Sequence, residues 1–179
     1  MSTFAIRLFG DPVLRQRARE VTDIDGDLVR LAHTMIDTMH EASGIGLAAP
    51  QVGVQKRLYT YDLGDGEGPA TIVNPEIVDA SGEWVYDEGC LSVPGLSFEI
   101  VRPKVITVRG LDLEGKEVVF EGDEVMGRLI QHEIDHLDGV LLLDRLEPEA
   151  RKAALRELRR AELDGSAAAT IGGDSNHRL

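Results

Sequence analysis

Residues 131–139 read QHEIDHLDG, and this stretch decides how the rest of the chain is interpreted. It contains the pattern His132-Glu133-x-x-His136 inside a segment with helical periodicity. Four residues of an α-helix rise about 6 Å and turn slightly more than once, so both imidazoles project from one face. Two histidines placed in this way can bind one metal ion, and Glu133 lies where it can move the protons of a metal-activated water. The pattern therefore predicts a metal-binding helix.

A third ligand has to come from another part of the chain, because a catalytic metal usually has three protein ligands and one open position. One protease pattern continues with a glycine and a third histidine, but Leu142 stands at that position. Glu157 and Glu162 lie among arginines, and solvated ion pairs account for them. Cys90 is the only cysteine in the chain. Taken alone, a single cysteine is more often a small buried apolar residue, but beside two histidines its thiolate is a credible ligand for iron or zinc.

The remaining periodicity predicts two further helices and a set of short strands. Residues 25–43 carry apolar side chains at three- and four-residue steps, with Gly44 as the expected left-handed C-cap. Residues 148–163 form a C-terminal helix that begins at a proline, and residues 123–137 form the metal-binding helix. Segments rich in β-branched and aromatic residues follow one another without intervening helices, which favours antiparallel pairing. They cover residues 57–61, 70–73, 83–86, 104–109 and 117–120.

We therefore predict an α+β fold: a single domain with short antiparallel β-sheets around a central metal-binding HExxH helix, plus an N-terminal and a C-terminal helix. A chain of 179 residues suits one domain with a real core. Residues 165–179 are small and polar, and we expect them to form a disordered tail after a catalytic domain over residues 1–164.

Charge and composition exclude some classes of protein. The formal net charge of -13 repels nucleic-acid phosphates, so we expect no binding to DNA. No stretch approaches the roughly 18 apolar residues of a membrane span. The first 20 residues are interrupted by charged side chains and lack the apolar run of a signal peptide. The expected location is the cytoplasm, without membrane contact.

A third unusual segment, GIGLAAPQ at residues 44–51, follows the first helix. Its small residues let another backbone approach closely, so it is suited to pair with an extended peptide. A tight connection from helix to strand explains the same residues. Gln51 adds an amide donor able to stabilise a developing oxyanion.

Three segments together, GIGLAAPQ at 44–51, EGCLS at 88–92 and QHEIDH at 131–136, resemble the signature motifs of the peptide deformylases. They occur in the family's order, and the resemblance spans at least residues 5–163. It implies hydrolytic removal of the N-formyl group from the N-terminal methionine of newly made proteins, releasing formate, by a metal-activated water. The implied partners are N-formylmethionyl nascent peptides, and residues 1–164 would be the deformylase catalytic domain.

The resemblance also implies roles for individual residues. Cys90, His132 and His136 would hold one divalent metal per chain. The metal expected natively is Fe²⁺, and Zn²⁺, Ni²⁺ or Co²⁺ can substitute. Glu133 would act as general acid and base. Gln51 and the backbone N–H of Leu91 would stabilise the oxyanion, and the ion pair Glu88–Arg102 would steady the ligand loop. The implied substrate-binding residues are Ile45, Gly46, Tyr86, Val125 and Leu129.

The sequence also departs from the family pattern. Some members carry a basic residue in the stretch that reads GLSF at 95–98 here, so peptide contacts beyond the methionine are expected to differ. Arg128 occupies a helix position that is apolar in some relatives, and the sequence leaves open whether it faces the pocket or solvent.

Two other functions compete with this one. A zinc endopeptidase would use the same histidine pair but would leave Cys90 and residues 44–51 unexplained. A non-catalytic metal or peptide-binding module would not need Glu133. The C-terminal helix raises a separate question, because residues 147–162 hold five basic and four acidic side chains in a very acidic protein. This charge allows weak docking to the ribosome, although a solvated helix face explains it as well.

Overall fold

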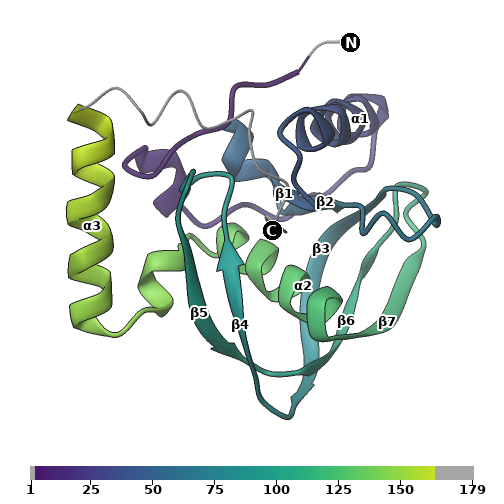
Figure 1. Cartoon of the computed structure of the whole chain (residues 1–179). Helices are drawn as coiled ribbons and strands as arrows, with labels where there is room; N and C mark the ends of the chain where they lie inside the picture. Colours follow the sequence, from purple (N-terminus) through teal and green to yellow (C-terminus); the bar gives the residue numbers. More distant parts are fainter. Residues whose placement is uncertain (1–2, 164–179) are drawn as a thin grey trace.

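Helix α2, Glu124–Leu137, is the central element of the computed structural model, which describes residues 3–163 (Figure 1). The expected tail at residues 165–179 lies outside the described residues. Two more α-helices are α1 (Gly26–Glu41) and α3 (Pro148–Leu163). Three short 3-10 helices are η1 (Pro12–Arg15), η2 (Ala49–Val52) and η3 (Leu142–Arg145). Among the described residues, no helix combines the length and the apolar character needed to cross a membrane.

Two antiparallel sheets surround α2. A five-stranded sheet has the order β1-β2-β3-β6-β7, and β4 pairs with β5 in a separate hairpin. The strand bounds are β1 (Gly46–Ala48), β2 (Leu58–Tyr61), β3 (Ala70–Ser81), β4 (Trp84–Gly89), β5 (Ser97–Arg102), β6 (Val105–Leu111) and β7 (Glu117–Asp123). Figure 1 shows α2 between the hairpin and the larger sheet. The predicted α+β fold, with antiparallel sheets around the HExxH helix, is confirmed.

Apolar side chains on both faces of the larger sheet anchor the two inner helices. Successive strand residues point to opposite faces. Tyr59 and Ile72 therefore pack with α2 in one core cluster, whereas Leu58 and Val73 pack with α1 in another. A third cluster joins the hairpin, η3 and α3, and it contains Cys90. The metal-binding helix is thus held in place from the sheet side and from the hairpin side.

Helix α1 ends differently from the prediction. It stops at Glu41 rather than near residue 43, and Ser43 rather than Gly44 takes the left-handed conformation, with φ of 55°. The N–H of Ser43 donates to the carbonyl of His40, and that of Gly44 to Met39, as in a Schellman motif. Gly44 is needed for another reason: a Cβ atom there would lie 2.7 Å from Leu91 Cδ1. The small residue permits close packing against the loop that follows β4.

Three strand predictions were incomplete. No strand was predicted at β5. Strand β1 falls within residues 44–51, for which peptide pairing and a tight helix-to-strand connection were both left open. Strand β3 continues to Ser81 instead of ending at residue 73. Asn74 and Pro75 resemble a turn, but Asn74 adopts a φ of 51° and the pairing register shifts between Val73 and Glu76. A β-bulge of this kind bends a strand without ending it. The longer β3 then pairs with β6 as far as its end.

Candidate metal centre and active site

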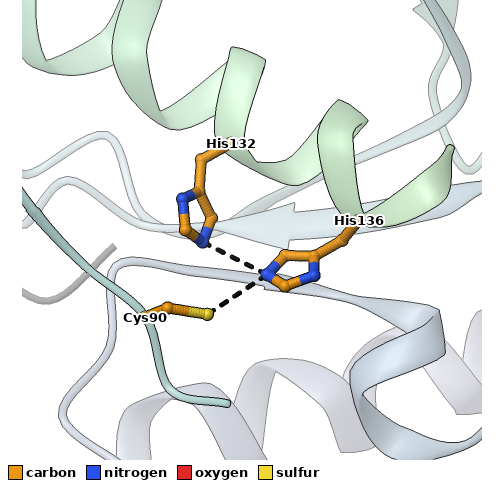
Figure 2. A group of neighbouring side chains, drawn as sticks. All are labelled: Cys90, His132 and His136. Carbon is orange, nitrogen blue, oxygen red and sulfur yellow. Dashed lines mark hydrogen bonds between the residues drawn. The ribbon is translucent and has the colours of Figure 1, made fainter. Parts of the chain in front are cut away.

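Cys90, His132 and His136 converge on one buried point (Figure 2). Both histidines project from α2, and Cys90 lies just after β4. The Cys90 Sγ to His136 Nε2 distance and the distance between the two histidine Nε2 atoms are both 3.2 Å. All three ligand atoms lie within 4.8 Å of one another, and each side chain is at most 2% exposed.

The chemistry of these three atoms fits a divalent metal. Ligand bonds of about 2.0–2.3 Å around a tetrahedral ion leave ligand atoms roughly 3.3–3.8 Å apart, close to the distances found. Two imidazole nitrogens and a thiolate sulfur are the ligand types preferred by zinc and iron. Burial lowers the pKa of His136 well below its usual value, whereas Cys90 and Glu88 outweigh burial at His132 and raise its pKa. A bound metal requires both imidazoles to be neutral, so metal binding would displace a proton from His132.

Glu88 fixes the orientation of the first histidine. Its Oε1 lies 2.6 Å from His132 Nδ1, so the Nε2 atom is left to face Cys90 and His136. Arg102 donates from Nε and Nη2 to the two oxygens of Glu88, at 2.8 and 2.6 Å. Burial would raise the pKa of Glu88, but the hydrogen bonds from Arg102 and His132 hold it well below its usual range. Glu88 is therefore an anion that orients His132.

Two further polar residues lie near this centre, and neither was predicted from the sequence. Asp135 accepts a hydrogen bond from Arg102 Nη1 at 2.9 Å and also binds Arg145. Ser92 accepts from Gln51 Nε2 at 3.2 Å and is 1% exposed. Both lie inside the quoted motifs, Asp135 between the two histidines and Ser92 after Cys90. Their polarity within buried segments was the signal that could have identified them.

The Glu133 carboxylate is fully buried beside the edge strand β1. Neither of its oxygens has a hydrogen-bond partner among the described residues. Gly46 makes room for it, because a Cβ atom on Gly46 would collide with Glu133 Oε1. Burial raises the pKa of Glu133 to about 7. A carboxyl group with this pKa can both accept and donate a proton near neutral pH.

Gln51 lies in η2 and points its amide toward the thiol. Its Oε1 accepts the backbone N–H of Ala48 at 2.8 Å, which fixes the side chain. Its Nε2 then faces Ser92 and lies 3.8 Å from Cys90 Sγ. Gln51 is 1% exposed, so its amide is both oriented and shielded from bulk solvent.

The remaining predicted site residues are more scattered. Leu91 is buried and packs with the α1 cluster, whereas Ile45 is half-buried at the edge of the α2 cluster. Leu129 is fully buried in that same α2 cluster, Val125 is half-buried one turn earlier, and Tyr86 is 37% exposed on β4. The structure thus brings Cys90, His132, His136, Glu133 and Gln51 together in a buried centre, while the proposed pocket residues range from buried to exposed.

Arg128, whose orientation the sequence left open, points inward. It is 1% exposed and donates from Nη1 to Glu88 Oε2 at 2.6 Å. Its Nη2 donates to the carbonyls of Trp84 and Ile100, both at 2.9 Å. The arginine therefore connects α2 with both strands of the hairpin.

This chain resembles known proteins in sequence and in overall structure. The family model described as "Polypeptide deformylase" matches residues 3–152. A curated protein named "Peptide deformylase" from Acidothermus cellulolyticus is 48% identical over 165 residues, covering 92% of this chain and 91% of its own. The crystal structure of a peptide deformylase from Legionella pneumophila is 42% identical with a TM-score of 0.87, covering 92% of this chain and 98% of its own.

A further similar protein has been solved with a bound ligand. It is a peptide deformylase from Synechococcus elongatus in complex with actinonin, 40% identical with a TM-score of 0.82, and the match covers 86% of each chain. The family model covers most of this chain, and the relatives match it over nearly their whole length. This protein is thus a member of the polypeptide deformylase family.

Proposed function

We propose that this protein hydrolyses the N-formyl group of N-terminal formylmethionine and releases formate. The observation that carries the proposal is the convergence of Cys90, His132 and His136 beside the buried, unpaired carboxylate of Glu133. Three ligands and one free carboxylate are what metal-assisted amide hydrolysis requires. The similarity to peptide deformylases over 92% of the chain supports the same reaction.

The proposed mechanism assigns one task to each group. Cys90, His132 and His136 would hold a divalent metal, which would supply Lewis acidity for activating water and polarising a carbonyl. Glu133 accepts a proton from the attacking water on a carboxylate oxygen and then delivers it to the nitrogen of the leaving methionine. Gln51 Nε2 and the Leu91 N–H donate to the oxygen of the formyl group as negative charge develops there. Glu88 keeps His132 Nε2 directed at the centre, and Arg102 keeps Glu88 in place.

The peptide is proposed to bind along β1. This strand lies at the edge of the five-stranded sheet, so one of its sides has no neighbouring strand in that sheet. Backbone groups of Ile45 and Gly46 would pair with the extended substrate. Tyr86, Val125 and Leu129 would line the space for the methionine side chain. Because Gly46 also accommodates Glu133, peptide pairing at β1 would bring the formyl group next to the carboxylate.

One assay tests the function. The metal-loaded protein should release formate from formyl-Met-Ala-Ser and should leave the unformylated peptide intact. Cleavage of internal peptide bonds without formate would favour the endopeptidase, and binding without turnover would favour the non-catalytic module.

We also propose that residues 1–164 form the whole catalytic domain, so a chain ending at residue 164 should match the full chain in this assay.

Gln51→Ala should reduce turnover more than substrate binding. The Gln51 amide is held by Ala48 and contributes an oriented donor, which is typically worth about 10²–10³ in rate. Steady-state kinetics with formyl-Met-Ala-Ser should show a lower kcat with KM little changed. A raised KM with unchanged kcat would instead make Gln51 a contact to the bound ground state. Gln55→Ala is the matched control, because Gln55 lies beyond the end of η2 and donates to the Val13 carbonyl instead of facing the centre.

The native metal is proposed to be Fe²⁺. Ligand affinity alone favours zinc over iron, so the proposal rests on the likeness to iron-dependent deformylases. A thiolate-bound ferrous site reacts with oxygen, whereas zinc has no redox chemistry. Matched iron, nickel and zinc preparations should therefore show the fastest turnover with iron, and only the iron form should lose activity in air. A zinc form as fast as the iron form, with neither affected by air, would contradict the assignment.

The proposed partners are nascent chains in the cytoplasm, and α3 is the surface proposed to contact the ribosome weakly. It exposes Lys152, Arg156, Arg159 and Arg160 in a protein whose net charge is -13. Replacing Arg159 and Arg160 by glutamate should reduce co-sedimentation with ribosomes at low salt. Formate release from a free tripeptide should stay unchanged. If wild type and the double glutamate variant co-sedimented equally, α3 would be a solvated helix without a role in ribosome binding.

A further inference from the structure

Arg128 is the least expected side chain near the centre, because an arginine is rarely fully buried. It precedes His132 by one helical turn, so both side chains project from the same face of α2. Glu88 lies opposite this face and contacts both residues, His132 through Oε1 and Arg128 through Oε2. A single carboxylate therefore bridges two consecutive turns of the metal-binding helix.

The hydrogen-bonding capacity of Glu88 is completely used. Oε1 accepts from Arg102 and faces His132 Nδ1, while Oε2 accepts from Arg102 and Arg128. A carboxylate has about four acceptor sites, so each site has a donor. Without Arg128, Glu88 would keep both Arg102 bonds and the His132 contact, but Oε2 would lose one of its two donors, so the tilt of the carboxylate would be less tightly fixed. A tilt would move the atom that fixes His132.

Arg128 also holds the strand that leads to the third ligand. Its Nη2 bonds the Trp84 carbonyl on β4 and the Ile100 carbonyl on β5. The rings of Trp84 and Tyr86 stack 4.7 Å apart and cover the guanidinium, whose Cζ lies 5.1 and 5.9 Å from their centres. Strand β4 ends at Gly89, and Cys90 follows it directly. One side chain thus ties α2, which carries two ligands, to the strand that carries the third.

Charge balance does not explain this arginine. Glu88 and Asp135 supply two negative charges, and Arg102 and Arg145 already supply two positive ones in the same network. Arg128 adds a third positive charge to two carboxylates, and burying it is costly. Buried ion pairs are weak evidence of stabilisation, whereas a fixed geometry is a recognised use of them. A role in geometry therefore accounts for Arg128 better than a role in charge balance.

We propose that Arg128 is a positioning residue for the metal centre: it locks Glu88 against His132 and fixes β4 relative to α2. The proposal rests on the metal role given above to Cys90, His132 and His136. It predicts that Arg128 controls how long the metal stays bound, although Arg128 touches none of the three ligand atoms. Residues that orient metal ligands typically contribute about 10–100-fold to metal affinity.

The test measures metal release directly. Four proteins are loaded with Zn²⁺ and mixed with an excess of a chromophoric chelator: wild type, Arg128→Met, Arg128→Lys and Arg145→Met. Arg128→Met, which preserves length but removes the donors, should release zinc about 10–100-fold faster than wild type. Arg128→Lys keeps one charged donor group, so its rate of zinc release should lie between the rates of wild type and Arg128→Met. Arg145→Met removes an arginine of the same network that does not contact Glu88, and it should release zinc like wild type.

A further readout separates positioning from general destabilisation. The Co²⁺ forms of Arg128→Met and Arg128→Lys should show altered visible absorption, because the Glu88–His132 contact has changed. If Arg128→Met does not fold, the test rests on Arg128→Lys alone. Zinc release from Arg128→Lys at the wild-type rate would then overturn the proposal. Equal acceleration by Arg145→Met would also overturn it. A wild-type protein that binds zinc but releases no formate would defeat the proposed function and leave this inference standing.

Discussion

Glu133→Gln should retain its metal and lose turnover by roughly 10²–10⁴-fold, the usual contribution of general acid–base catalysis. The carboxylate is not one of the three proposed ligands and forms no hydrogen bond to them, so its removal leaves three ligands in place. It is the one buried carboxylate in the α2 centre whose oxygens both lack a hydrogen-bond partner among the described residues. Neither oxygen is therefore occupied by a structural contact, and both are available to a water.

Stability gives this prediction a second readout. Burial raises the pKa of Glu133 to about 7, which means that the ionised form costs free energy in the folded protein. Replacing it by the neutral, equally large glutamine breaks no hydrogen bond to a described residue. The metal-free variant should therefore melt no lower than metal-free wild type. A folded, metallated Glu133→Gln with near-normal kcat would remove Glu133 from the mechanism.

Local patterns were enough to predict the centre of the fold. The i, i+4 spacing of His132 and His136 depends only on helix geometry, so it placed both ligands on one face of α2 without tertiary information. The two longer helices beside it also followed from periodicity. Strand β5 was missed because its pairing with β4, not its own short pattern, makes it a strand. Strand β1 has only three residues and gains its order from β2.

The surroundings of the metal centre were harder to predict, because they depend on contacts between distant segments. Arg128 and Glu88 are 40 residues apart, and only the packing of the hairpin on α2 brings them together. From its position on the helix, Arg128 could point either into the protein or toward solvent. In the structure it points inward, and the stacked rings of Trp84 and Tyr86 cover its guanidinium. Similarly, nothing local to Gly46 indicates that its missing side chain makes room for Glu133. Such relations exist only in the folded chain.

Cys90→Ala should lose most of its metal while keeping its fold, and it is the sharpest test of the ligand set. Protein zinc sites bind with about 10–16 kcal/mol in total, so one ligand of three or four accounts for about 3 kcal/mol or more. That loss corresponds to a fall in affinity of over about a hundredfold. Alanine removes only a sulfur from a side chain that is 2% exposed in the third core cluster, so the packing change is small.

The comparison across ligands makes the Cys90 result decisive. His132→Ala and His136→Ala should lose metal as Cys90→Ala does, whereas His33→Ala, on the exposed face of α1, should keep a full equivalent. Elemental analysis after gel filtration with a weak chelator measures the metal content, and circular dichroism checks that each variant is folded. If Cys90→Ala kept full occupancy while the two histidine variants did not, the third ligand would have to be sought elsewhere. Glu133, whose buried oxygens have no hydrogen-bond partner among the described residues, would then be the first residue to examine, and its role as a free acid–base group would fall if it proved to be the ligand.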